Sequence, residues 1–99
     1  MSKIIIDLQD GFDNDQVIIQ IDHQEVYRKE NVSTQLLLGF ADSVTTEAPT
    51  DPFTVTVEVL SRSLTQEIPL VKSEIAYLGL SLTGSSLVYL VSDHEFWYG

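Results

Sequence analysis

Residues 53–60 read Phe-Thr-Val-Thr-Val-Glu-Val-Leu, and apolar side chains alternate with polar ones through residue 59. Because successive side chains of a β-strand point to opposite faces, Phe53, Val55, Val57 and Val59 would share one face. β-branched residues dominate the stretch, and they suit a pleated surface. Turn-forming residues flank it on both sides. The stretch therefore predicts a half-buried β-strand against which the other strands pack.

The same alternation recurs along the rest of the 99-residue chain, which is long enough for one modest core. Turn-forming residues separate the segments that read as strands, which are 3–8, 16–22, 26–29, 41–47, 64–72, 75–82 and 87–91. Short strands at this spacing predict an all-β fold, an antiparallel β-sandwich of seven or eight strands in a single domain, 1–99. The expected core contains Val55, Val57, Val59, Ile19, Ile21, Leu78 and Leu80.

For three segments the sequence also bears on the type of element or on its position in a sheet. Residues 31–48 alternate as a strand would, but several of their apolar residues also fit one face of a short helix; Gly39 favours the extended form. Pro69 cannot donate a ladder hydrogen bond, so 64–72 is expected at a sheet edge. Residues 87–91 are apolar on both faces, which predicts a central strand.

The segment 21–26, Ile-Asp-His-Gln-Glu-Val, resembles the strand–turn–strand start of small bacterial Ig-like or prealbumin-like (transthyretin-like) sandwich modules. Those modules often read Val-Asp-Gly-x-x-Val at this point, and His23 stands where they usually have Gly. The resemblance implies an accessory, adhesive or scaffold domain that has no catalytic site of its own.

Fifteen acidic residues against five basic ones give a net charge of −10. This charge repels phosphate backbones and anionic membranes, so neither nucleic acid nor a membrane is an expected partner. It also keeps a sheet-rich surface soluble. The chain has no cysteine, which excludes disulfides and slightly favours the cytoplasm. Asp7 interrupts the first apolar run before it is long enough for a signal peptide.

The loop after the first strand is rich in carboxylates. Asp10, Asp13 and Asp15, with Asn14 between the last two, supply the hard oxygen ligands that calcium requires. The EF-hand order of ligands is absent, and Asp and Asn are also the residues that a tight, solvated turn prefers. A calcium site and a plain turn are both open interpretations.

The C-terminal aromatic triplet Phe96, Trp97 and Tyr98 is the one local excess of aromatic residues. It would serve as a stacking platform for sugars or as an anchor in a partner's pocket. Alternatively, the segment 93–98 folds back and one ring, Trp97 foremost, closes an open end of the core.

No catalytic constellation is visible. Gly84-Ser85-Ser86 lacks the frame of a nucleophile elbow and reads as a hairpin turn, while His23 and His94 read as surface residues. The leading hypothesis is a non-catalytic structural or protein-interaction module, a monomer or weak homo-oligomer with an unspecified protein partner and no cofactor. The alternative is a calcium- or carbohydrate-binding β-sandwich module.

Overall fold

The computed structural model describes residues 3–35, 37–47, 51–71, 77–94 and 96. In these ranges the chain forms eight strands and one short 3₁₀ turn, η1, and contains no helix long and apolar enough to cross a membrane. The elements are β1 Lys3–Leu8, β2 Asp15–Ile21, β3 Gln24–Val32, β4 Asp42–Glu47, β5 Phe53–Val59, η1 Leu60–Arg62, β6 Leu64–Leu70, β7 Tyr77–Thr83 and β8 Ser86–Ser92.

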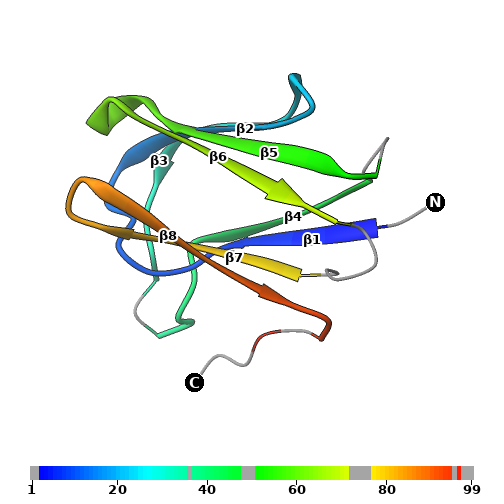
Figure 1. Cartoon of the computed structure of the whole chain (residues 1–99). Helices are drawn as coiled ribbons and strands as arrows, with labels where there is room; N and C mark the ends of the chain where they lie inside the picture. Colours follow the sequence, from blue (N-terminus) through cyan, green and yellow to red (C-terminus); the bar gives the residue numbers. More distant parts are fainter. Residues whose placement is uncertain (1–2, 36, 48–50, 72–76, 95, 97–99) are drawn as a thin grey trace.

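The strands form two four-stranded sheets that face each other (Figure 1), with the orders β4-β1-β7-β8 and β3-β2-β5-β6. The all-β, two-sheet prediction is therefore confirmed. One pairing departs from the expected antiparallel pattern, because β1 and β7 run parallel, with Ile5 opposite Tyr77 and Leu8 opposite Leu80. These two strands are distant in the sequence, so no hairpin forces them to run in opposite directions.

β5 lies between β2 and β6, and its apolar face belongs to the core. Val57 pairs with Ile19 of β2, and both side chains are fully buried. The predicted core residues Val55, Val57, Val59, Ile19, Ile21, Leu78 and Leu80 are all buried. β6 is an edge strand, as Pro69 predicted.

The β2–β3 hairpin turns through Asp22 and His23, whose φ angles are 48° and 70°. Positive φ at both central residues defines the turn type that suits the twist of a two-residue hairpin. The Asp22 carboxylate accepts a hydrogen bond from the Thr54 N–H at 2.9 Å and fastens this turn to β5. His23 therefore adopts the backbone conformation that Gly would adopt more easily.

In the described part of the segment 31–48, residues 31–35 and 37–47, the chain forms neither one strand nor a helix. β3 ends at Val32, an isolated bridge joins Gln35 to Phe40, and β4 begins at Asp42. Gly39, with a φ of 79°, donates its N–H to the Gln35 carbonyl at 2.8 Å. The expected alternation across residues 32–40 was wrong, because this turn interrupts it; the further strand at 41–47 is confirmed.

The prediction that 87–91 is a central strand was also wrong. β8 ends its sheet, and the side chains of Val88, Tyr89, Leu90 and Val91 are 43–58% exposed. An apolar sequence on both faces indicates what the strand can bury, but the lateral order of strands decides what covers it.

Candidate functional site

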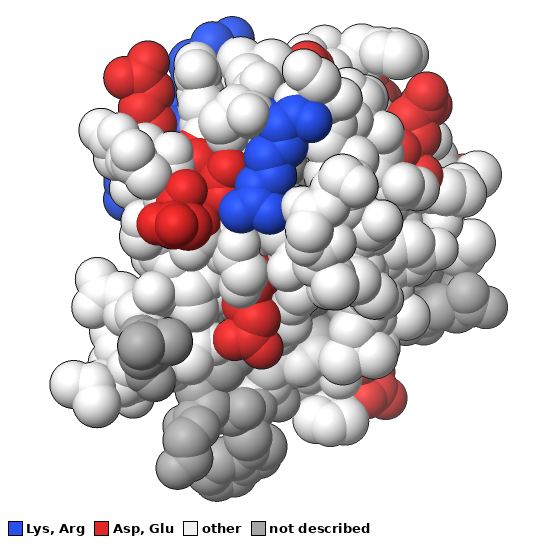
Figure 2. Space-filling view, turned by 90° about the vertical axis from the view of Figure 1, so that its left-hand side faces the viewer, with Lys and Arg blue, Asp and Glu red and all other residues white. Residues whose placement is uncertain are grey.

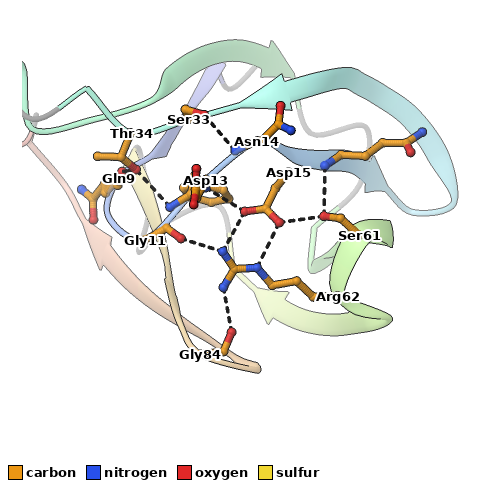
Figure 3. A network of polar contacts seen from close by, with 12 residues as sticks. Gln9, Gly11, Asp13, Asn14, Asp15, Ser33, Thr34, Ser61, Arg62 and Gly84 are labelled. Atoms are coloured by element: carbon orange, nitrogen blue, oxygen red, sulfur yellow. Dashed lines mark hydrogen bonds and ion pairs between the residues drawn. The ribbon is translucent and has the colours of Figure 1, made fainter.

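A polar network occupies the end of the sandwich where the calcium-site candidates lie (Figures 2 and 3), and acidic groups there sit directly beside a basic one. Asp15 opens β2, and its side chain is only 3% exposed. Arg62 contacts both carboxylate oxygens: Nε donates to Oδ1 at 3.0 Å and Nη2 donates to Oδ2 at 2.8 Å. This two-pronged geometry is the strongest form of a charge-assisted hydrogen bond.

The same guanidinium also bonds two loops. Nη1 of Arg62 donates to the Gly84 carbonyl at 2.7 Å, and Nη2 donates to the Gly11 carbonyl at 2.9 Å. η1 brings Arg62 to this position, and Ser63 then leaves the turn with a left-handed φ of 52°. One side chain thus joins the start of β2, the loop after β1, the β5–β6 connection and the β7–β8 turn.

Burial would by itself raise the pKa of Asp15, since it disfavours the charged form. Hydrogen bonds from the Arg62 guanidinium, the Asp13 backbone N–H and the Ser61 hydroxyl outweigh that effect and hold the pKa below its ordinary value. The carboxylate is therefore ionised, paired and fully bonded near neutral pH.

Asp10 and Asp13 are exposed on the same loop, while Asp15 directs its oxygens at Arg62. The residues that the structure describes contain no cluster of three or more His, Cys, Asp or Glu side chains able to hold a metal ion. A guanidinium on both oxygens of Asp15 opposes a second cation there. Calcium binding at Asp10, Asp13 and Asp15 stays a prediction of the sequence alone.

Sequence reasoning missed Arg62 as the partner of Asp15, although the chain has only five basic residues. The signal that could have identified it is the position of a basic residue just after a predicted strand in so acidic a chain. The two histidines are exposed, as predicted, and His94 lies 2.8 Å from the Asp93 carboxylate.

The outer face of the β4-β1-β7-β8 sheet carries a shallow groove of about 310 Å³, lined by Ile5, Asp7, Phe40, Ser43, Thr45, Tyr77 and Phe96. Asp7 is 8% exposed and accepts a hydrogen bond from the Ser43 hydroxyl at 2.7 Å. The ring of Phe96 stands edge-on to that of Tyr77, with centroids 6.4 Å apart. Of the predicted aromatic triplet, Phe96 thus contacts the body of the protein, whereas Trp97 and Tyr98 lie outside the described residues.

A second depression, of about 370 Å³, lies beside β8 and is lined by Gln9, Gly79, Ser81, Val88, Tyr89 and Leu90. The Gln9 side-chain amide lies 2.6 Å from the place where a Cβ on Gly79 would stand, so a larger residue at position 79 would require the Gln9 side chain to move. We call the exposed side chains Val88, Tyr89, Leu90 and Val91 the β8 apolar edge.

No protein family, no curated protein and no solved structure matches this chain.

Proposed function

We propose that this chain is a non-catalytic protein-interaction module that binds its partner by accepting a β-strand at the β8 apolar edge. The observation that carries the proposal is the concentration of exposed apolar side chains on one uncharged edge strand. Strands exposed in this way are templates for pairing with another chain.

The main chain of β8 supports the same conclusion. Thr83 and Ser86 are opposite each other across a two-residue turn. The pair that closes such a turn is hydrogen-bonded, and bonded and non-bonded pairs then alternate along the hairpin. The N–H and C=O groups of Leu87, Tyr89 and Val91 therefore point away from β7, toward the side where an added strand would lie.

The side chains of β8 complement an added strand on both faces. Leu87, Tyr89 and Val91 stand opposite the buried row Leu82, Leu80 and Leu78 of β7, so they continue the inner apolar face beyond the edge. Val88 and Leu90 continue the outer face. An incoming strand would thus gain main-chain hydrogen bonds and two apolar contact surfaces.

We further propose that the sandwich is of the Ig-like or prealbumin-like type. Its two four-stranded sheets and the tight hairpin through Asp22 and His23 support that assignment. In modules of this kind the sandwich is typically a scaffold or adhesive unit, which agrees with an interaction role.

The test of the interaction role is a strand-peptide titration followed by amide NMR. The peptide carries the β8 sequence, Ser-Leu-Val-Tyr-Leu-Val-Ser, between flanking lysines; the matched control peptide has proline in place of its tyrosine. We expect the first peptide to shift the amide signals of Leu87, Tyr89 and Val91, and the control peptide to leave them unchanged, because proline removes a donor to the added ladder. Equal responses to both peptides, or none to either, would contradict the proposal.

The outer-face groove supports carbohydrate binding as a second candidate function. The perpendicular rings of Tyr77 and Phe96 lie beside the Asp7 carboxylate and the Ser43 hydroxyl, a combination of stacking surface and hydrogen-bonding groups that suits a sugar. Soluble oligosaccharides are titrated against the protein and against Tyr77→Ala. Shifts confined to the groove and lost in the variant support this candidate, and a flat titration dismisses it.

A further inference from the structure

We propose that the strand which β8 accepts is β8 of a second copy of this chain, forming a two-fold symmetric dimer with one continuous eight-stranded sheet. This inference rests on the proposed interaction role of the β8 apolar edge and names its partner. Three features of β8 indicate that its partner is a second copy: its sequence, the direction in which its N–H and C=O groups point, and its difference from the other sheet edges.

The sequence of β8 is self-complementary about Tyr89. Reading outward from Tyr89, Val88 is matched by Leu90, Leu87 by Val91, and the strand has serine at both ends. In a two-fold dimer each residue of an antiparallel pair meets its mirror counterpart. Every apolar side chain of one copy would therefore face an apolar side chain of the other.

The main-chain geometry allows this register. Leu87, Tyr89 and Val91 carry the outward-pointing N–H and C=O groups, and pairing about Tyr89 places Leu87 opposite Val91 of the second copy and Tyr89 opposite Tyr89. All three outward positions then meet outward positions. A register shifted by one residue would place them opposite inward-pointing groups and would turn side chains to the wrong face. Among the permitted registers, the one centred on Tyr89 pairs all seven residues of the strand.

The other three sheet edges carry features that oppose pairing. β6 contains Pro69 and Glu67, β4 has acidic residues at both ends, and the register of β3 with β2 is irregular at two places. β3 also carries the charged side chains Glu25, Arg28, Lys29 and Glu30. β8 has no proline, no charged residue and an unbroken register with β7. Charges, prolines and bulges are the usual protection of edge strands, and among the four edge strands that the structure describes β8 alone lacks all three.

The part of the tail that the structure describes leaves this edge accessible. Phe96 lies against Tyr77 and lines the groove with Ile5 and Phe40, on the β1 side of β7. Its ring therefore sits on the outer face of the sheet, and the side chains of Val88 to Val91 stay 43–58% exposed.

The net charge of the chain determines how salt affects the dimer. Each copy carries −10, so two copies repel each other through their remaining surfaces while the paired strands are uncharged. Salt screens that repulsion, since the Debye length falls from about 10 Å at 0.1 M to about 3 Å at 1 M. Dimerisation should strengthen with salt, whereas binding of a basic partner would weaken.

Pairing along one seven-residue strand buries less than the roughly 800 Å² per partner of a standard interface. We therefore expect a reversible dimer with a dissociation constant on the order of 10–100 μM at about 0.5 M salt.

The experiment is sedimentation equilibrium of the full chain from about 5 μM to about 1 mM, at low and high salt. We expect the weight-average mass to rise from 11.1 kDa toward twice that value, and to do so at lower concentration in high salt. Leu90→Lys should remain monomeric throughout, because a charge on an edge strand blocks pairing. The matched control is Thr65→Lys on the exposed β6 edge, which introduces the same charge and should dimerise like the parent chain.

Register is tested separately with Tyr89→Cys, since the chain has no other cysteine. A hydrogen-bonded antiparallel pair has its Cα atoms about 5.5 Å apart, within disulfide range, so oxidation should link two copies rapidly. Thr65→Cys should link far more slowly.

A parent chain that stays at 11.1 kDa at 1 mM in both salts, while the strand peptide still binds β8, would overturn the second-copy inference and leave the interaction role standing. If the peptide fails as well, both fail together. A dimer broken by Thr65→Lys and not by Leu90→Lys would place the contact on β6 and would also overturn the inference.

Discussion

Replacing Arg62 by methionine removes the guanidinium from Asp15 and keeps an apolar stem of similar length. The Asp15 side chain, only 3% exposed, would keep its hydrogen bonds from Ser61 and the Asp13 N–H but lose its counter-charge. Removing one partner of a buried ion pair costs about 3–5 kcal/mol. Because the Arg62 side chain is 23% exposed, water reaches part of the vacated space, so we expect the lower end, about 3 kcal/mol.

For a domain of this size a loss of about 3 kcal/mol lowers the melting temperature by roughly 12–24 °C. The measurement is urea unfolding at pH 7 followed by far-UV circular dichroism, with thermal melts alongside. Arg28→Met is the matched control: Arg28 pairs with Glu25 at 2.7 Å, but both side chains are exposed, so this variant should melt like the parent chain.

The contribution of the Asp15–Arg62 pair to stability should also depend on pH. The pKa of Asp15 is held below its ordinary 3.8, so its contribution to stability is complete above that value and is lost as pH falls through the lower, folded pKa. Without Arg62 the effect of burial gains weight and favours the protonated carboxyl, so the variant gains relative stability in acid. The difference in unfolding free energy between parent and Arg62→Met should shrink between pH 7 and pH 3. A difference below about 0.5 kcal/mol at pH 7, or one that grows in acid, would refute the stabilising role of this pair.

Three further predictions concern packing and ionisation. Gly11→Ala should destabilise the fold by more than about 2 kcal/mol in urea unfolding, because its φ is 86° and a Cβ there would stand 1.9 Å from the Leu82 carbonyl oxygen; a variant as stable as the parent would show that this loop packs differently. Val57→Ala should cost about 1–3 kcal/mol through lost burial and a cavity, and an unchanged melting curve would remove Val57 from the core. Burial raises the pKa of Tyr27, and so does the Asp42 carboxylate, which accepts a 2.8 Å hydrogen bond from the phenol. In an alkaline spectrophotometric titration the parent and Tyr27→Phe should therefore differ only above the pH at which ordinary tyrosines ionise, and a difference near pH 10 would contradict this.

Local pattern was sufficient for most of the strands. The period-two alternation of residues 53–60 identified β5 and its buried face, and Pro69 placed β6 at an edge because it cannot donate to a ladder. Turn residues located the hairpins, including the one through His23. These features are decided by neighbours in the sequence, so they can be predicted from it.

Tertiary structure decided what each strand touches. The parallel pairing of β1 with β7 and the ion pair of Asp15 with Arg62 both join residues that are far apart in the sequence. The edge position of β8 likewise depends on which strands pair, and no local pattern shows it. Residues 87–91 show the limit most clearly, since the same apolar run would be a buried central strand with one more neighbour and is an exposed edge without it. The alternation of side chains follows from the local backbone geometry, whereas the lateral order of strands depends on pairing between residues far apart in the sequence.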